Sequence, residues 1–417
     1  MCGRTAPKGD DVRKYVEEAR GLQDDIVADR RHLHQIPEVG MDLPETFAYV
    51  AKRLDEIGIA WRPCGIMREE LTNKYVEMGF PRMEHSTGIV ATIGSGSPCI
   101  LLRADYDALP IEEENDLPFC SKRNCSHLCG HDAHAAMLLS AARILKAHED
   151  ELKGTVKLMF QPGEELGYGA RTMIEDGLLE NPHVDAAFAL HVMSTEPKGM
   201  VVYTPGVTSS SLDTFALHVQ GRGGHTSAPQ QCIDPLMVAN QVYEAINLFM
   251  TREITPGTPA TLSCGVMKAG NASNVIPDTA EMHFGLRSRD VVARAHVLER
   301  IPEIIDAYVR AWRADYRLSI FNCPIAFNNE ELLVSLMPAF EAVAGVSGVK
   351  QGSPMQGTED FGHVSEEVPS VYVLLGAGGP NMPPHHNPRM TIDEDVLWMG
   401  TALYACSAVR WLSVHAR

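Results

Sequence analysis

The sequence lacks long apolar runs and is poor in basic residues. No segment is long and apolar enough to cross a bilayer, and residues 1–23 are polar, without the apolar core of a signal peptide. The 36 basic residues are outnumbered by 54 acidic ones, which gives a formal net charge of -18. This charge disfavours nucleic acid and anionic membranes as partners. We therefore expect a cytoplasmic protein.

The ten cysteines show no regular disulfide framework, so we interpret most of them as reduced and buried. Cys120, Cys125 and Cys129 cluster, which raises the alternative of a structural zinc site. No further cysteine pair completes four thiolates, so we disfavour that alternative. The length of 417 residues predicts two domains rather than one.

The stretch at residues 126–134 (SHLCGHDAH) is denser in metal-binding atoms than any other. Residues 133–146 after it are rich in Ala and Leu and free of Gly and Pro, which predicts a helix. The dipole and unpaired N–H groups at the start of that helix favour a thiolate at Cys129. Taken alone, the stretch fits a metal site and a buried structural cysteine beside surface histidines equally well.

Alternating strands and helices predict an α/β fold with a mostly parallel sheet that helices cover on both faces. The predicted strands are residues 85–93, 99–106, 155–161, 185–190 and 371–375. The predicted helices are residues 11–33, 46–57, 133–146, 170–176, 330–345 and 394–412. We interpret the polar, irregular stretch 67–82 as an inserted loop.

A change in composition at residues 204–211 (TPGVTSSS) indicates a crossing into a second domain. The predicted order after it is βαββαβ, typical of a ferredoxin-like unit. Its strands are residues 212–219, 260–267, 279–286 and 316–321, and its helices are residues 235–250 and 291–312. We therefore predict a discontinuous catalytic domain, residues 1–207 and 326–417, and an inserted domain, residues 208–325.

Polar residues follow three predicted strands at their carboxyl ends, where ligands gather in parallel sheets. They are Asp105 and Asp107, the adjacent acids Glu164 and Glu165, and His191. Paired acids in a turn are commonly only a solvated loop. At this edge, however, one carboxylate can bind a cation while its neighbour takes a proton from water. A histidine at the end of an apolar strand is commonly a core residue, which remains an alternative for His191.

His386 lies in a loop stiffened by prolines on both sides (PPHHNP). With Cys129, His131, one carboxylate of the pair Glu164 and Glu165, and His191, it makes five candidate ligands, which suit two metals better than one. Cysteine and histidine with one carboxylate favour zinc, with manganese, cobalt or nickel as alternatives. Two metals that share a ligand can hold a hydroxide and polarise a carbonyl, which is amide-hydrolysis chemistry.

Eight motifs occur in the order seen in the M20 metallopeptidases, and the sequence resembles that family over nearly its whole length. The resemblance is greatest to its amidohydrolase branch, which includes hippurate hydrolase, auxin-conjugate hydrolases and bacterial aminoacylases. The motifs are RRHLHQIPE (30–38), RADYDALP (103–110), CGHDAH (129–134), QPGEE (161–165), GRGGH (221–225), NVIP (274–277), GTEDF (357–361) and HNP (386–388).

The resemblance implies two divalent metal ions that share one ligand. Their ligands would be Cys129 as the bridge, Glu165 and His386 in one site, and His131 and His191 in the other. Glu164 would be the general base that activates a metal-bound water, and Asp107 would orient a metal-bound imidazole.

The inserted domain resembles the family's lid and dimerisation domain, which implies a homodimer or higher homo-oligomer. In it His225 would polarise the scissile carbonyl. Asn274 and Arg287 would hold the substrate carboxylate, with Arg289 as an alternative to Arg287.

The resemblance therefore predicts hydrolysis of the amide bond of small N-acyl or N-aroyl amino acids, or of similar conjugates with a free carboxylate. A dipeptidase and a deacetylase of an amino acid precursor are alternatives with the same chemistry. A catalytically silent metal-binding scaffold is the alternative from another class, although the base and all five ligands are intact. Leu128, Gly163 and residues 166–169 depart from the family's pattern, which leaves the substrate side chain open.

Overall fold

The computed structural model describes residues 12–77 and 82–416, and the chain divides into two compact units. Unit 1 comprises Met1–Thr208, Ala326–Pro354 and Asp360–Arg417, and unit 2 comprises Ser209–Ile325 and Met355–Glu359. Unit 2 thus differs from the predicted inserted domain by Thr208 and by the short return of the chain at Met355–Glu359. No helix among the described residues is both long and apolar enough for a membrane span.

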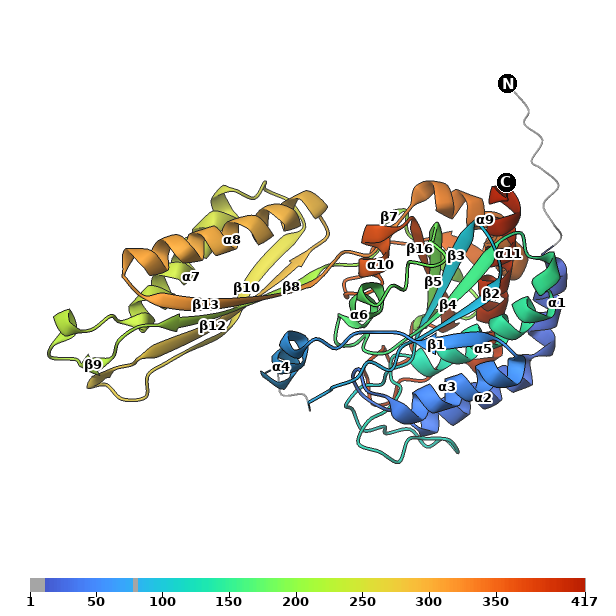
Figure 1. Ribbon diagram of the computed structural model, residues 1–417, viewed down its shortest axis with the longest axis horizontal. Helices are drawn as coiled ribbons and strands as arrows, with labels where there is room; N and C mark the ends of the chain where they lie inside the picture. Colours follow the sequence, from blue (N-terminus) through green and yellow to red (C-terminus); the bar gives the residue numbers. More distant parts are fainter. Residues whose placement is uncertain (1–11, 78–81, 417) are drawn as a thin grey trace, which may run out of the picture. The chain divides into compact units, whose positions relative to one another are not determined.

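Unit 1 is built on an eight-stranded sheet in the order β1-β2-β4-β3-β5-β16-β6-β15 (Figure 1). The strands are β1 (Ala60–Pro63), β2 (Ile89–Gly94), β3 (Cys99–Asp105), β4 (Thr155–Gln161), β5 (Ala186–Pro197), β6 (Val201–Tyr203), β15 (Val349–Gln351) and β16 (Ser370–Gly378). Its four central strands, β4, β3, β5 and β16, run parallel, while β2 and β6 run antiparallel to their central neighbours. The predicted mostly parallel α/β sheet is therefore confirmed. Two short strands, β7 (Gly206–Val207) and β14 (Phe327–Asn328), pair separately.

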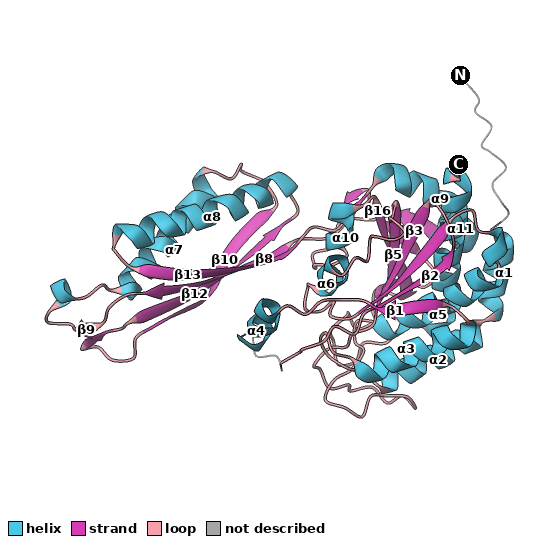
Figure 2. Ribbon diagram, in the orientation of Figure 1, coloured by secondary structure: helices cyan, strands magenta, loops and turns pink. Residues whose placement is uncertain are grey.

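Helices lie on both sides of this sheet, as Figure 2 shows. They are α1 (Arg13–Gly21), α2 (Gln23–Gln35), α3 (Pro44–Ile57), α4 (Glu69–Glu77), α5 (His131–Ala147), α6 (Gly169–Glu175), α9 (Glu330–Ala344), α10 (Gly362–Glu367) and α11 (Leu397–His415). Helices α5 and α11 pack on β3 and β5 and on each other. Every residue of β3 and β4 is buried, which explains why these strands lack the polar alternation of a sheet with one solvated face.

Three sequence predictions for unit 1 were wrong in detail. The helix predicted at residues 11–33 is two helices, because the chain turns at Leu22 between α1 and α2. The stretch predicted as a loop at residues 67–82 contains helix α4, whose Tyr75 is fully buried in a small cluster with Met41, Met83 and Leu166. Residues 78–81 of that stretch lie outside the described residues. Strand β5 does not end near His191 but continues to Pro197, because β16 pairs with it along that length.

Unit 2 is a four-stranded antiparallel sheet in the order β10-β12-β8-β13, with two helices packed on it. Its elements are β8 (Leu212–Gln220), α7 (Pro235–Arg252), β10 (Ala260–Ala269), β12 (Thr279–Ser288), α8 (Val291–Ala311) and β13 (Asp315–Cys323). A separate pair joins β9 (Gly224–His225) to β11 (Val275–Ile276). The order is βαββαβ, so the ferredoxin-like prediction is confirmed.

The sheet of unit 2 has one apolar and one polar face. Along β8, buried Phe215, Leu217 and Val219 alternate with half-buried residues, and along β12 buried Met282 and Phe284 do the same. These apolar side chains form one core with residues of α7 and α8. The opposite face of the sheet therefore carries the intervening, more polar side chains.

Candidate metal centre

The five predicted ligands come from four separate parts of unit 1. Cys129 lies just before α5, His131 is the first residue of α5, Glu165 follows β4, His191 lies in β5, and His386 lies in the loop after β16. Strands β3, β4 and β5 are parallel neighbours, so their carboxyl ends meet at one edge of the sheet. The fold therefore brings together residues that are far apart in sequence.

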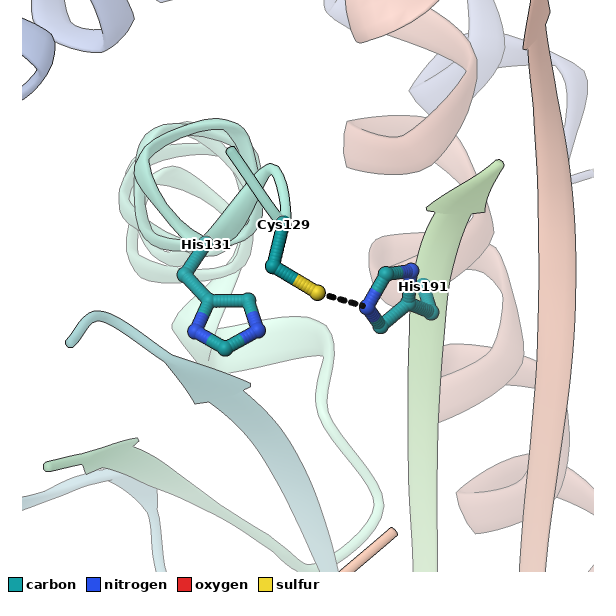
Figure 3. A group of neighbouring side chains, drawn as sticks. All are labelled: Cys129, His131 and His191. Atoms are coloured by element: carbon teal, nitrogen blue, oxygen red, sulfur yellow. Dashed lines mark hydrogen bonds between the residues drawn. The ribbon is translucent and has the colours of Figure 1, made fainter. Parts of the chain in front are cut away.

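The ligand atoms form two groups that share Cys129. One group is Cys129, His131 and His191, the other is Cys129, Glu165 and His386, and the atoms within each group lie within 4.8 Å of one another. Sγ of Cys129 lies 3.5 Å from Nε2 of His191 (Figure 3), and Nε2 of His386 lies 3.3 Å from Oε1 of Glu165. At these separations, a cation can lie about 2.0–2.3 Å from each ligand atom of one group.

Gly130 gives the turn between Cys129 and His131 its shape. Its φ of 87° is left-handed, and an added Cβ would lie 2.4 Å from Cγ2 of Val192 on β5. Any other residue would be strained at this φ and would push against the Val192 side chain. As a result, the thiol of Cys129 lies between the rings of His131 and His191 (Figure 3).

Asp107 contacts two of the candidate ligands. Nδ1 of His131 lies 3.1 Å from Oδ1 of Asp107 and 3.0 Å from its backbone oxygen. The other carboxylate oxygen of Asp107 accepts a hydrogen bond of 3.0 Å from the backbone N–H of Glu165. This leaves Nε2 of His131 facing the cluster, with no hydrogen-bond partner among the described residues. Such a contact fixes the ring and the nitrogen available to a metal.

No role is predicted for His134 from the sequence. In the structure its ring contacts connect α5 to β3 and β5. Its Nδ1 lies 2.5 Å from Oδ1 of Asp105 at the end of β3, and its Nε2 accepts a hydrogen bond of 2.9 Å from the backbone N–H of Val192. Both ring nitrogens are therefore engaged in joining α5 to β3 and β5. His134 holds the residue next to His191 in place, a role that no spacing in the sequence reveals.

His385 and His386 are neighbours with different surroundings. Nδ1 of His385 lies 3.1 Å from the backbone oxygen of Cys129, and its Nε2 accepts from the backbone N–H of Ser194 at 3.1 Å. The backbone N–H of His386 donates to Leu128 at 2.9 Å, and His386 has a φ of 65°. This left-handed conformation is costly for a non-glycine residue. His385 thus fastens the loop to the Cys129 turn, while the His386 ring reaches Glu165.

The candidate ligands have pKa shifts in both directions. Burial lowers the pKa of His131, but the nearby Asp105 carboxylate and further acidic neighbours together outweigh burial, and the pKa is raised well above its ordinary value. Burial, and then the Glu165 carboxylate, raise the pKa of the Cys129 thiol well above its ordinary value, against the lowering expected at a helix start. A bound divalent cation would reverse this balance, because it deprotonates a coordinating thiol. Burial lowers the pKa of His191 well below its ordinary value, so the imidazole is neutral, as a ligand must be. A thiol, imidazoles and one carboxylate form a zinc-type donor set.

Glu164 lies at the rim of the cluster. Its Oε2 is 3.9 Å from Nε2 of His131, and its side chain is 11% exposed. Together with His131 and Glu165 it forms a further group of atoms within 4.8 Å of one another. A carboxylate in this position can reach a water held between the ligands.

The remaining predicted residues lie in unit 2. His225 in β9 and Asn274 just before β11 are neighbours, because the backbone N–H of Thr226 donates to the backbone oxygen of Asn274 at 3.3 Å. Arg287 lies near the end of β12, and its guanidinium donates to Oγ1 of Thr358. Most of the length of β12 separates Arg287 from the other two, so unit 2 does not bring the three residues together.

Comparisons with known proteins match the chain over most of its length. A model of peptidase family M20/M25/M40 matches residues 101–410. Thermostable carboxypeptidase 1 of Saccharolobus solfataricus is 33% identical over 410 residues, which cover 96% of this chain and 98% of that protein. N-acetyl-L-cysteine deacetylase of Bacillus subtilis is 33% identical over 412 residues, covering 97% of this chain and 93% of that protein.

Solved structures give the same result. The structure of the Bacillus subtilis protein YXEP, described as a dinuclear metal-binding peptidase from the M20 family, matches with a TM-score of 0.72 and 29% sequence identity. The match covers 94% of this chain and 99% of that one. The similarity therefore extends over both units of the chain.

Proposed function

The chain belongs to peptidase family M20/M25/M40, and we propose that it hydrolyses the amide bond of small N-acyl or N-aroyl amino acids. The observation that carries this proposal is the pair of ligand groups that share Cys129, with Glu164 at their rim. The relative named N-acetyl-L-cysteine deacetylase, which aligns with 97% of this chain, supports an acylated amino acid as the substrate class.

The proposed metal ligands are the five residues of the two groups. Cys129 would bridge two divalent cations, Glu165 and His386 would complete one site, and His131 and His191 would complete the other. We propose Zn²⁺, and Mn²⁺, Co²⁺ and Ni²⁺ are alternatives that the same donors accept. Two such ions, when bound, polarise the scissile carbonyl and lower the pKa of the attacking water.

The chain's own residues perform the proton transfers. Glu164 would take a proton from the attacking water and deliver it to the leaving amine nitrogen, as a general base and then a general acid. Asp107 would keep Nε2 of His131 directed at the cluster through the contact at Nδ1. Both assignments rest on the distances in unit 1.

Unit 2 is proposed as the lid and dimerisation domain. His225 would polarise the scissile carbonyl and Asn274 would bind the substrate carboxylate, and their adjacency supports a shared role. Arg287 would be a further partner of the substrate carboxylate. It contacts Thr358, which does not support Arg287 and Asn274 binding the same carboxylate. Exposed apolar side chains on the helices of unit 2, such as Leu248 and Val292, support pairing of two copies.

A dipeptidase is the second candidate, because a carboxypeptidase is among the similar proteins. A panel of N-acetyl and N-benzoyl amino acids and dipeptides separates the two candidates by kcat/KM. We expect the acylated amino acids to be the better substrates, with activity lost on chelation and restored by Zn²⁺. Preference for dipeptides would favour the second candidate, and chelation without effect on turnover would contradict both.

A further inference from the structure

A second group of metal-binding atoms lies in unit 2, on the polar face of its sheet. It consists of Nε2 or Nδ1 of His218 and His283 and a carboxylate oxygen of Glu281, all within 4.8 Å of one another. None of these residues belongs to the motifs that define the catalytic cluster. We propose that His218, Glu281 and His283 form an independent site for a divalent metal ion such as Zn²⁺.

The strand register explains why these side chains converge. Glu281 and His283 are two apart on β12, so they point to the same face of the sheet. His218 on β8 lies directly opposite Glu281 in the antiparallel ladder. Directly opposed and diagonal residues on one face are the side-chain pairs that contact each other in a sheet. The rings of His218 and His283 are 6.3 Å apart between centroids.

The contacts within the group leave a donor atom for a cation. Nε2 of His283 lies 2.8 Å from Oε1 of Glu281, but it makes no hydrogen bond in the described part of the chain. The side chains of His283 and Glu281 are 36% and 29% exposed, while Nε2 of His283 itself is buried beside the Glu281 carboxylate. Two imidazoles and one carboxylate are the protein ligands of many zinc sites that keep a position open for water.

The neighbouring strand provides room beside His283. The register of β10 against β12 shifts between Cys264 and Val266, so Gly265 is an extra residue next to His283. A Cβ added at Gly265 would meet no atom within 4 Å. The bulge therefore places no side chain beside His283 at Gly265, and the space at that position is open.

The alternative is a simple surface ion pair in which a protonated His283 contacts Glu281. Lys268, whose Nζ lies 4.0 Å from Glu281, would then be a second cation in the same network. An ion pair needs no contribution from His218, whereas a metal site does. The role of His218 therefore separates the two interpretations.

The test is metal stoichiometry in the full chain, measured by mass spectrometry after dialysis against Zn²⁺ alone. The wild type is expected to hold one more Zn²⁺ per chain than its catalytic cluster does. His218→Ala and His283→Ala should each weaken this additional binding by roughly tenfold or more, because one of three ligands is lost. Hydrolytic activity should remain unchanged in both variants.

His296→Ala is the matched control. His296 also lies in unit 2 and pairs with a glutamate, Glu253, at 3.2 Å, and its side chain is 37% exposed. The control should keep the additional Zn²⁺. Equal loss in the control would show unspecific binding to surface histidines and would overturn the proposal. Retention of the additional Zn²⁺ in His218→Ala, or its absence in the wild type, would overturn it as well.

Cu²⁺ in place of the additional Zn²⁺ provides a structural readout. The electron paramagnetic resonance spectrum should show coupling to two imidazole nitrogens in the wild type and to one in His218→Ala. The same spectrum in both proteins would overturn the assignment of His218. Because this site shares no residue with the proposed catalytic residues, failure here would leave the proposed hydrolytic function untouched.

Discussion

The chain carries two groups of histidine and acidic side chains that differ in how the fold assembles them. In unit 1 the proposed ligands come from the start of α5, from the turn after β4, from the middle of β5 and from a loop, and His131 and His191 are buried while His386 is 51% exposed. In unit 2 they come from two neighbouring antiparallel strands and are partly exposed. We call the unit 1 group the buried group, after His131 and His191, and the unit 2 group the exposed group. The first is supported by several elements, while the second depends on two neighbouring strands.

This difference makes distinct predictions for the two groups. The buried group is surrounded by residues such as Asp107, His134 and His385 that fix its members. The exposed group has the strand register and two flanking basic residues, Lys268 opposite Glu281 and Arg317 opposite His218. Substitutions should therefore have large effects on catalysis and metal affinity in unit 1 and small effects on metal affinity in unit 2.

The largest effect is expected for Glu164→Gln. Loss of the general base should lower kcat by about 10²–10⁴-fold, while the metal content stays that of the wild type because the five proposed ligands are unchanged. Steady-state kinetics together with metal analysis measures both quantities. Glu114→Gln is the matched control, since Glu114 is a surface acid of unit 1 paired with Arg389 at 2.9 Å. Turnover retained in Glu164→Gln would remove the mechanism.

A smaller effect is expected for Asp107→Asn. The substitution removes the charge that faces Nδ1 of His131, so metal affinity should fall by about 10–100-fold. Competition with a chelator measures the affinity, and excess metal should restore most of the turnover. Asp150→Asn, at an exposed position, should change neither quantity. An unchanged affinity in Asp107→Asn would show that this contact does not orient the ligand.

The two groups also differ in what the sequence revealed. The M20 family and the enzyme class follow from motifs such as CGHDAH and QPGEE, because a short turn, a helix start and a strand end each leave a local pattern. His218 and Glu281 are far apart in sequence, and their contact depends on the register of β8 and β12. Register is set by the packing of the whole sheet, so this group has no local signal.

Contacts between residues distant in sequence also explain where the predicted secondary structure was wrong. The central strands β3 and β4 were predicted almost to the residue because they are continuously apolar and fully buried. Helix α4 was missed because Tyr75 packs against Met41 and Leu166, which are distant in sequence. The HNP motif singles out His386, while the role of His385 in fastening the loop to Cys129 depends on the loop conformation and has no local signal.

Arg287 gives a test within unit 2. If Arg287 and Asn274 act on the same substrate carboxylate, Arg287→Ala and Asn274→Ala should each raise KM by about 10-fold, as loss of a hydrogen bond to a charged group does, with kcat little changed. The separation of the two residues within unit 2 predicts instead that only Asn274→Ala behaves in this way. Arg289→Ala tests the alternative arginine for the same role. A KM increase in Arg287→Ala equal to that of Asn274→Ala would support Arg287 as a partner of the substrate carboxylate, and an unchanged KM would remove it from that role.

The smallest effect is expected for Lys268→Gln at the exposed group. Lys268 lies opposite Glu281 on β10, with Nζ 4.0 Å from the carboxylate, so its charge repels a cation bound there. Its removal should tighten binding of the additional Zn²⁺ by about two- to fivefold at low salt, and the gain should shrink at high salt because exposed charges are screened. Lys350→Gln, on the surface of unit 1, should have no effect on this binding. Weaker binding in Lys268→Gln would mean that the lysine holds Glu281 in place rather than competing with the metal. The exposed group would then resemble the buried group, because both would need a supporting residue.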